Sequence, residues 1–441
     1  MSEHFVGLSY QDIPTSVVDS VKKLVLDFLG VSLAGSRTES GRIAQTFALE
    51  MGGSPQVSLI GRKEKTGIVH AAFANAICAH SVELDDVDEL ALFHFGPPIV
   101  SAALATAEMV GASGKEFLIA VVAGCEMMAR LSRGCNPSLR DRGFHTTPVC
   151  GAFGAAVASS KLLRLSSREM VSALGLAGAQ ASGLMEMYDD SMQKRVNPGP
   201  AARNGVTAAL LARSGFTGTD RILEGERGFG KAFCDEFWPE KVLENLGEEI
   251  PVNIEFKPYA CARPIHNAID CALSIRQQPG FDSTRIKAIR VWRHPAWAKY
   301  HMNNSPHSFH EAQVSLPYSV AVALLEGNAL LQQYGEDRLN SEQVQRLTKM
   351  VEVLEDPSLP RGVSCRMEVT MESGLFLSAQ VDYPKGSLKN PMTHEELEEK
   401  AHLLGDEVVG KAALSEAIAK VGDLEHLCSV VELLKPVCLR S

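Results

Sequence analysis

The stretch from Cys150 to Ser160 reads Cys-Gly-Ala-Phe-Gly-Ala-Ala-Val-Ala-Ser-Ser, and nearly all of its side chains are small. Small side chains let the axes of two packed helices approach closely. Apolar residues recur at helical spacing in this stretch and in others of the first 250 residues, near 13–34, 40–51, 67–82, 97–110, 114–132, 146–163, 167–188, 200–214 and 219–223. We therefore expect the first half of the chain to form a compact bundle of helices.

The pattern changes after about residue 250. Alternation of apolar and polar residues predicts strands at 252–256, 286–292, 363–369 and 375–381, and Glu372-Ser373-Gly374 predicts a hairpin between the last two. Helices are predicted near 266–275, 312–325 and 341–353, and helical patterning resumes at Thr393.

The predicted fold is therefore mainly α with a smaller α+β domain. Residues 1–250 and 394–441 form two segments of a discontinuous helical large domain, and residues 252–393 form an α+β domain inserted between them. A chain of 441 residues that is 45% hydrophobic is long enough to bury such cores.

Composition narrows the class of protein. The net charge of −10 and a pI near 5.8 exclude a general nucleic-acid binder. The purest apolar run, Phe117 to Cys125, is shorter than the ~18 residues of a membrane span, and the first residues lack the basic and apolar parts of a signal peptide. The ten cysteines form no CxxC pair and are expected to be reduced thiols. We expect a cytoplasmic protein with neither a nucleic-acid nor a membrane partner.

The sequence contains no complete nucleotide-binding or zinc-binding motif, so we expect neither a cofactor nor a metal. Gly225 to Ala232 nearly matches a phosphate-binding loop, but Ala232 stands where a hydroxyl would bind Mg²⁺, and no dinucleotide-binding GxGxxG occurs. The histidines between His294 and His310 form no ligand spacing typical of zinc, and no HExxH is present.

Three other segments bring together groups suited to proton transfer. The acidic run Glu83 to Glu89 precedes His94, and it reads either as a solvated face, as carboxylates that orient an imidazole, or as a cation site that lacks EF-hand spacing. His145 stands just before a predicted helix start, where exposed amides favour anions. Lys194, Arg195 and Arg203 surround another helix start, and their alternative role is that of surface cations.

Together these segments resemble the MmgE/PrpD family, and the resemblance spans nearly the whole chain. Six motifs occur in the family order, namely His-Ser-Val-Glu-Leu-Asp-Asp from His80, the loop His94, Gly-Phe-His-Thr-Thr-Pro with His145, Gln-Lys-Arg-Val-Asn-Pro-Gly-Pro-Ala-Ala with Lys194, Lys-Pro-Tyr-Ala-Cys-Ala-Arg-Pro-Ile-His from Lys257 to His266, and Glu-Ala-Gln-Val-Ser-Leu-Pro-Tyr ending at Tyr318. The resemblance implies an active site in a cleft between a helical and an α+β domain, no organic cofactor, and usually a homodimer.

The resemblance also implies the site residues and the kind of reaction. Known members act on small polycarboxylates, where a proton beside a carboxylate moves, and they include 2-methylcitrate dehydratase, cis-aconitate decarboxylase and iminodisuccinate epimerase. The matching positions make catalytic candidates of His94, His145, Lys194, His266 and Tyr318, and substrate-binding or orienting candidates of Asp85, Asp86, Lys257, Arg203 and Arg263. His, Lys and Tyr can handle protons while cations and hydrogen-bond donors stabilise the enediolate-like charge.

The chain departs from the family pattern at positions that bear on the reaction. Asn197 often corresponds to a His, and Ala262 stands where the animal decarboxylase has a His. The second departure weighs against a decarboxylase. The chain is also shorter than typical dehydratases and decarboxylases of the family, and one base with one opposing acid suffices for epimerisation. The sequence therefore favours an epimerase with an iminodisuccinate-like substrate, with a methylcitrate-type dehydratase as the alternative and a cis-aconitate-type decarboxylase behind it.

Overall fold

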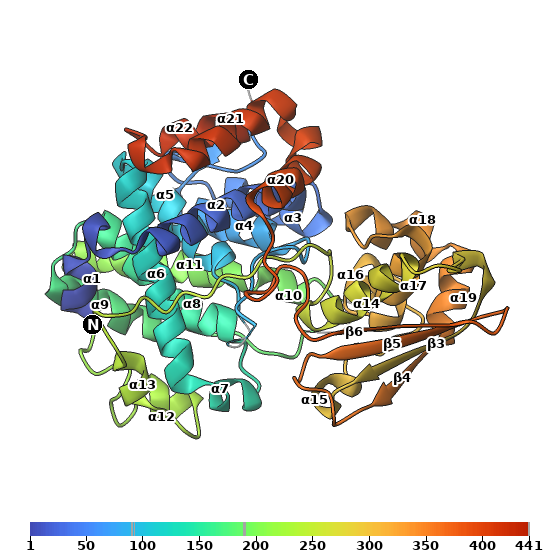
Figure 1. Cartoon of the computed structure of the whole chain (residues 1–441). Coiled ribbons are helices and arrows are strands. Elements are labelled where there is room, and N and C mark those ends of the chain that lie inside the picture. Colours follow the sequence, from blue (N-terminus) through green and yellow to red (C-terminus); the bar gives the residue numbers. More distant parts are fainter. Residues whose placement is uncertain (90, 92, 188–190, 440–441) are drawn as a thin grey trace. The chain divides into compact units, whose positions relative to one another are not determined.

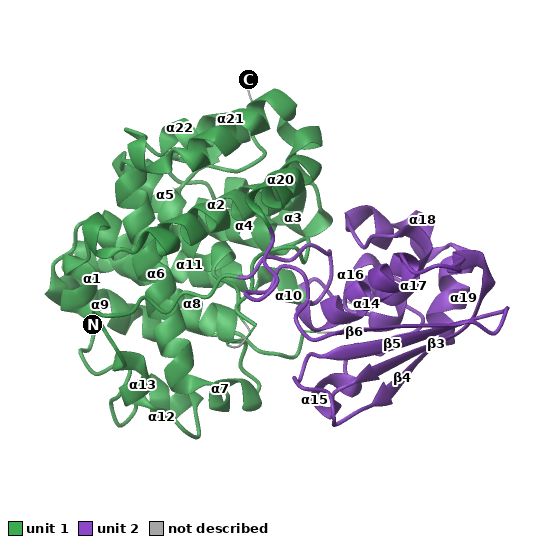
Figure 2. Ribbon diagram, viewed as in Figure 1, with its two compact units in different colours: residues 1–187, 193–254, 393–441 green, residues 188–192, 255–392 purple. Residues whose placement is uncertain are grey.

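The computed structural model describes residues 1–89, 91, 93–187 and 191–439 and divides the chain into two compact units (Figures 1 and 2). Unit 1 comprises Met1–Met187, Gln193–Ile254 and Thr393–Ser441, and unit 2 comprises Tyr188–Met192 and Glu255–Met392. Helices dominate the chain, and the main sheet lies in unit 2. The predicted fold class, mainly α with a smaller α+β domain, is confirmed.

Unit 1 is a helical bundle with one short hairpin, β1 (Val57–Ser58) and β2 (Lys65–Thr66). Its helices are α1 (Ser2–Gly7), α2 (Thr15–Gly35), α3 (Glu39–Met51), α4 (Ile68–His80), α5 (Ser101–Val110), α6 (Gly114–Cys135), α7 (Ser138–Asp141), α8 (Thr146–Leu162), α9 (Ser167–Gly178), α10 (Gln193–Val196), α11 (Pro198–Arg213), α12 (Phe229–Phe233), α13 (Pro239–Leu243), α20 (His394–Val409), α21 (Lys411–Gly422) and α22 (Val431–Leu434). Among the described residues, none of the helices has an uncharged apolar stretch long enough to cross a membrane.

Glycine explains how closely α6 and α8 approach. A Cβ atom on Gly124 would lie 2.8 Å from the carbonyl oxygen of Gly154, and one on Gly154 would lie 2.6 Å from that of Gly124. Both separations are shorter than a van der Waals contact, so only glycine fits at this crossing. The close helix approach predicted from the small residues of 150–160 is therefore observed.

Unit 2 contains a four-stranded mixed sheet in the order β4-β3-β5-β6. β3 (Ile286–Arg293) pairs in parallel with β4 (Val351–Glu355) and antiparallel with β5 (Cys365–Met371), which forms a hairpin with β6 (Phe376–Val381). The helices of this unit are α14 (His266–Arg276), α15 (Pro295–Ala298), α16 (Phe309–Gln313), α17 (Leu316–Glu326), α18 (Glu336–Leu339) and α19 (Glu342–Met350). The burial pattern of β5 alternates strictly, as expected of a strand with one face on a core.

Four predicted elements differ in the structure. The run 219–223 forms turns, and α9 ends at Gly178, ten residues before the predicted end at 188, which lies outside the described residues. Gly183, with φ +144°, could not continue that helix. The run 252–256 joins no sheet, and the N–H of Phe256 donates instead to the carbonyl of Gly386. The helix predicted at 341–353 ends at Met350, because Val351 begins β4.

Candidate active site

Three histidines and two aspartates gather in unit 1, and we call His80, Asp85, Asp86, His94 and His145 the histidine cluster. His80 is the last residue of α4, so the end of this small-residue helix delivers its ring directly to the acidic segment that follows. All five residues are buried, and His94 is the least so, with 11% of its side chain exposed. The acidic segment is therefore part of the interior, and its reading as a solvated face is wrong.

Asp85 holds two of the imidazoles. His80 Nδ1 lies 2.7 Å from Asp85 Oδ2, and His94 Nδ1 lies 3.1 Å from the same oxygen. The two rings meet edge to face, with centroids 4.8 Å apart. One carboxylate thus orients both rings, as the sequence reading of carboxylates beside a histidine predicts.

Asp86 fixes the loop that carries His94. Its carboxylate accepts the N–H of Phe95 at 2.7 Å and the N–H of Gly96 at 2.8 Å, which caps the π-helical turn η2 (Gly96–Val100). A Cβ on Gly96 would lie 2.7 Å from Asp86 Oδ1, so this capping contact requires glycine.

The main chain at Asp86 determines the tautomer of His94. His94 Nδ1 lies 2.5 Å from the carbonyl oxygen of Asp86. A carbonyl oxygen only accepts, so Nδ1 must carry the proton, and the neutral ring then has its lone pair on Nε2. His94 is therefore arranged to accept a proton at Nε2.

His145 has the opposite arrangement. It is the N-cap residue of α8, and its Nδ1 lies 3.0 Å from the amide nitrogen of Asn197. An amide nitrogen donates, so Nδ1 accepts and Nε2 of the neutral ring carries the proton. The same helix start binds the loop histidine, since the N–H of His94 donates to Thr147 Oγ1 at 3.1 Å. His145 is thus arranged to donate a proton.

Burial sets the charge states of the cluster. It lowers the pKa of His80 to about 4, although the neighbouring Asp85 acts in the other direction. Burial also lowers the pKa of His145 well below its usual range, and His80, His94 and Lys194 add to this effect. Burial raises the pKa of Asp86 to about 7, against the effect of His94. His80 and His145 are therefore neutral at pH 7. A neutral ring carries its proton on one nitrogen only, as the arrangement of His145 requires.

Two cations of α10 meet at a buried carboxylate. Lys194 Nζ and Arg195 Nη1 both bind Glu83 Oε1. Glu83 has φ 57°, a left-handed conformation that is uncommon for a residue other than glycine. Both cations of α10 are therefore held at a buried carboxylate of the acidic segment, and the role of Lys194 toward a substrate stays a prediction.

Arg203, the other predicted cation of unit 1, lies on α11. Its guanidinium stacks over the ring of Phe73, 5.4 Å from the centroid, and its Nε donates to Asn204. Phe73 lies about two turns before His80 along α4, since 3.6 residues make a turn. The structure thus gives Arg203 a packing contact and does not bring it into the histidine cluster.

The remaining predicted site residues belong to unit 2. Lys257 and His266 are almost fully buried, and His266 begins α14 with its Nε2 3.3 Å from the carbonyl of Cys261. Arg263 pairs with Glu255 at 3.0 Å, and its Nη1 lies 3.4 Å from His266 Nδ1. Arg263 is therefore a neutralised cation within this unit.

Tyr318 lies elsewhere in unit 2, on α17. Its hydroxyl donates to the carbonyl of Gln333 at 2.7 Å, and burial raises its pKa above the usual range. The catalytic roles predicted for His266 and Tyr318 remain predictions.

Three residues of the cluster could hold a metal ion. His80, Asp85 and His94 each offer a ligand atom, and these atoms all lie within 4.8 Å of one another. A metal on His80 Nδ1 would shift the proton to Nε2, which is buried and has no hydrogen-bond partner among the described residues. Metal-binding histidines usually donate their second N–H to a partner. The arrangement therefore suits a hydrogen-bonded triad better than a metal centre.

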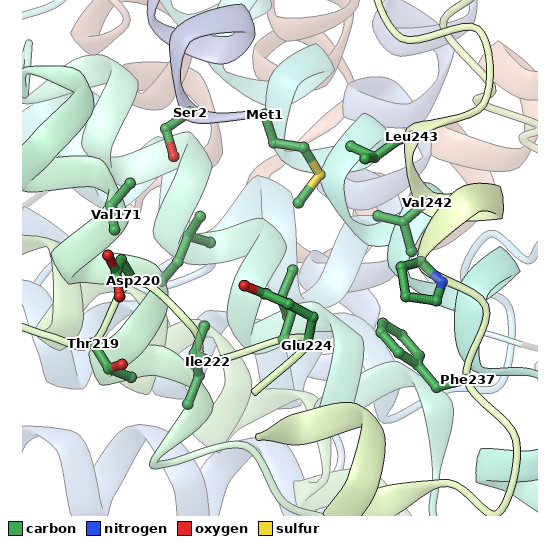
Figure 3. Close-up of a pocket in the computed structure, with 13 residues that line it drawn as sticks. Met1, Ser2, Val171, Thr219, Asp220, Ile222, Glu224, Phe237, Val242 and Leu243 are labelled. Carbon is green, nitrogen blue, oxygen red and sulfur yellow. The ribbon is translucent and has the colours of Figure 1, made fainter. Parts of the chain in front are cut away.

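A cavity of about 270 Å³ lies apart from the cluster (Figure 3). Its walls are mostly apolar and include Val171, Ile222 and Phe237, with the carboxylates of Asp220 and Glu224 at the chain segment between α11 and α12. None of the predicted site residues lines it. The cavity therefore adds nothing to the candidate site.

Sequence reasoning missed two members of the site. His80 begins the motif His-Ser-Val-Glu-Leu-Asp-Asp but is not among the predicted site residues, although its position between a small-residue helix and the acidic run is a usable signal. Asn197 was noted as a departure, and nothing in the sequence indicated its contact with His145.

Comparison with known proteins shows the family of the chain. The MmgE/PrpD N-terminal domain matches residues 1–241, and the MmgE/PrpD C-terminal domain matches residues 259–424. A cis-aconitate decarboxylase-like protein of Aspergillus oryzae is 31% identical over 457 residues, which cover 97% of this chain and 94% of that protein. The cis-aconitate decarboxylases of Aspergillus terreus and Homo sapiens are each 29% identical, again over 97% of this chain and over 93% and 92% of their own lengths. The chain therefore belongs to the MmgE/PrpD family of enzymes.

Proposed function

We propose that this protein is a cofactor-independent lyase of small polycarboxylates that releases CO2 from a cis-aconitate-like substrate. The relatives named as cis-aconitate decarboxylases match nearly the whole chain and support this reaction over the epimerase that the sequence favours. The observation that carries proton transfer is the opposite hydrogen bonding of two histidines near the start of α8, because Nδ1 of His94 donates whereas Nδ1 of His145 accepts and leaves its proton on Nε2.

The reaction assigns a definite task to the donor. When the C–C bond to the leaving carboxylate breaks, its electron pair forms a new C=C bond to the neighbouring carbon. The pair of the original C=C bond shifts to the carbon beside a second carboxylate. The resulting carbanion takes one proton, so one proton is consumed for each CO2 released. In this proposal His145 Nε2–H delivers that proton, and solvent water returns a proton to the ring before the next turnover.

Electrostatics supports an anionic substrate at this place. The start of α8 presents the positive end of a 17-residue helix, and α10 carries two cations, Lys194 and Arg195, that bind Glu83. Both features stabilise negative charge that grows on a carboxylate in the transition state. The sequence predicts the same stabilising role for the cationic residues of unit 2, above all for Lys257, and that role stays a prediction.

One observation favours a second candidate, epimerisation. Decarboxylation needs only a proton donor, whereas this site also carries a base at His94 Nε2. A base and an acid together can remove a proton from a carbon beside a carboxylate and return it to the other face. The Ala262 departure also favours this candidate, because the animal decarboxylase has a histidine there.

A substrate panel separates the two reactions. Purified protein is incubated in D2O with cis-aconitate, methylcitrate, citrate and iminodisuccinate stereoisomers, and products are followed by NMR and by CO2 release. We expect CO2 and one incorporated deuteron from cis-aconitate. Interconversion of stereoisomers with deuterium at the α carbon would instead support the epimerase, and an unreactive panel would contradict both.

Variants connect the reaction to the histidine cluster. We expect His145→Gln to lower kcat/KM by about 10²- to 10⁴-fold, the usual range for loss of a general acid. His394→Gln is the matched control, because that histidine is 52% exposed and pairs with Glu398 at the surface. Wild-type kinetics in His145→Gln would remove this residue from the reaction.

We also propose that the protein is a homodimer in which α3 pairs with its copy. Arg42, Ile43, Phe47, Glu50 and Met51 lie on one exposed face of α3, where Ile43, Phe47 and Met51 are 56%, 42% and 55% exposed. In an antiparallel pair related by a two-fold axis near Thr46, Arg42 of each copy would face Glu50 of the other. Such self-complementarity is typical of an isologous interface.

A further inference from the structure

Lys400 connects helix α20 to the acidic loop of the histidine cluster. Its side chain is buried, with 8% exposed, and its Nζ lies 2.6 Å from Asp27 Oδ1 on α2 and 2.6 Å from the carbonyl oxygen of Leu84. Both hydrogen bonds are short, as expected when the donor is charged. A buried ammonium thus binds one carboxylate and one main-chain carbonyl, both in unit 1.

The orientation of the Leu84 carbonyl determines how the loop presents Asp85. The peptide group between Leu84 and Asp85 is planar, so holding the Leu84 oxygen fixes the orientation of the N–H of Asp85 as well. On the other side, Glu83 turns the chain through a left-handed conformation. Lys400 therefore holds the peptide that separates this turn from the aspartate bound to His80 and His94.

Charge provides a second connection. Asp27 is buried, and its negative charge is one of the causes that raise the pKa of Asp86. The ammonium of Lys400 offsets that charge at a distance of 2.6 Å. Without Lys400, the buried carboxylates of Asp27 and Asp86 would repel each other more strongly, and Asp86 fixes the loop that carries His94.

We propose that Lys400 is a positioning residue for the histidine cluster: by holding the Leu84 carbonyl and neutralising Asp27, it keeps Asp85 and Asp86 in place and thereby keeps the proton of His94 on Nδ1. Its link to catalysis rests on the proposed function, and on its second candidate above all, because epimerisation uses His94 as the base. The position of the proton on His94 is a property of the free protein, so it can be measured without any substrate.

Three variants separate the two contacts. Lys400→Met removes both, Lys400→Arg keeps the charge, and the double variant Asp27→Asn/Lys400→Met removes the buried charges while still lacking a donor to Leu84. Lys420→Met is the matched control, because Lys420 also binds a carboxylate, Glu416, and a carbonyl, Glu432, but outside this loop. Circular dichroism establishes that each variant is folded.

The experiment is ¹⁵N NMR of histidine-labelled full-length protein, in which protonated and unprotonated ring nitrogens give well-separated signals. The His94 signals are assigned from the spectrum of His94→Gln. We expect wild type, Lys420→Met and Lys400→Arg to show His94 with its proton on Nδ1 alone. The double variant should show a mixture of tautomers, and so should Lys400→Met if it folds. With a reacting substrate, kcat of the double variant should fall by about 10- to 100-fold, the cost of a misplaced catalytic group.

A single His94 tautomer in the double variant, identical to that of wild type, would overturn the positioning role. Failure of Lys400→Arg to retain the wild-type spectrum would overturn it as well. If the tautomers respond as expected but wild type reacts with no member of the substrate panel, the proposed function fails and the positioning role stands.

Discussion

The ammonium of Lys194 forms a buried ion pair with the carboxylate of Glu83. The sequence presents Lys194 as a cation available to a substrate carboxylate, whereas in the structure it also neutralises the protein's own anion. Arg195 shares that anion. Removing one cation and removing the carboxylate should therefore have different consequences for folding.

We expect Glu83→Gln to lower the free energy of unfolding by about 3–5 kcal/mol, because it removes the anion from between two buried cations. Lys194→Met should cost clearly less stability, since Arg195 still binds Glu83, while lowering kcat/KM at least about tenfold. Urea denaturation and steady-state kinetics provide the two measurements. Equal losses of stability in both variants would contradict this account of the ion pair.

The pH dependence of stability should change when Asp86 is replaced. The pKa of His80 falls from 6.5 to about 4 on folding, so its contribution to stability is full above pH 6.5 and is lost as the pH falls toward 4. The pKa of Asp86 rises from 3.8 to about 7, so its contribution is full below 3.8 and is lost as the pH rises through 7. Between these limits the two groups oppose each other.

Asp86→Asn removes one of the opposing groups. On acidification from pH 6.5 to 4.5, stability of this variant should fall more steeply than that of wild type, by about 1.4 kcal/mol for each pH unit. Urea unfolding at four pH values measures the slope. Parallel curves for the two proteins would show that Asp86 is already ionised in the folded state.

Charge reversal tests the proposed α3 pairing. Arg42→Glu would place like charges opposite each other and, together with Phe47→Asp, should convert a dimer to a monomer in light scattering at micromolar concentration. Arg42→Glu combined with Glu50→Arg should restore the dimer, because the pairing is antiparallel. A dimer that survives Phe47→Asp would place the interface elsewhere.

Chelation tests the hydrogen-bonded reading of His80, Asp85 and His94. We expect exhaustive treatment with EDTA to leave turnover unchanged, because the Nδ1 atoms of both histidines lie within hydrogen-bond distance of Asp85. Loss of turnover that a divalent ion restores would make these three residues metal ligands.

Periodicity predicted most helices and the β5–β6 hairpin, because those segments are long or strictly alternating. It failed at 341–353, where Met350 and Val351 continue an apolar pattern that fits both a helix and a strand. Only the pairing of Val351 with Ile289 in the folded sheet decides between them. The prediction of a strand at 252–256 was wrong for a related reason, because alternation alone does not show whether a neighbouring strand is available for pairing.

The candidate site could be predicted in its residue types but not in its pairings. His94, His145 and the aspartates were identified from motifs, yet the neutral state of His145 depends on burial, and its tautomer depends on Asn197. Lys400 lies in a helix that looks like an ordinary amphipathic element, and its partners are 373 and 316 residues away. Contacts over such separations leave no local signal.

That separation has a consequence for synthesis of the chain on the ribosome. Asp27 and Leu84 emerge early, whereas Lys400 emerges only after all of unit 2 has been translated. Domains generally fold as units during synthesis, and contacts between distant parts of a chain form late. The nascent protein therefore carries an unanchored acidic loop until Lys400 has been synthesised and binds Asp27. A translation product truncated before Lys400 would have the histidines but lack their support.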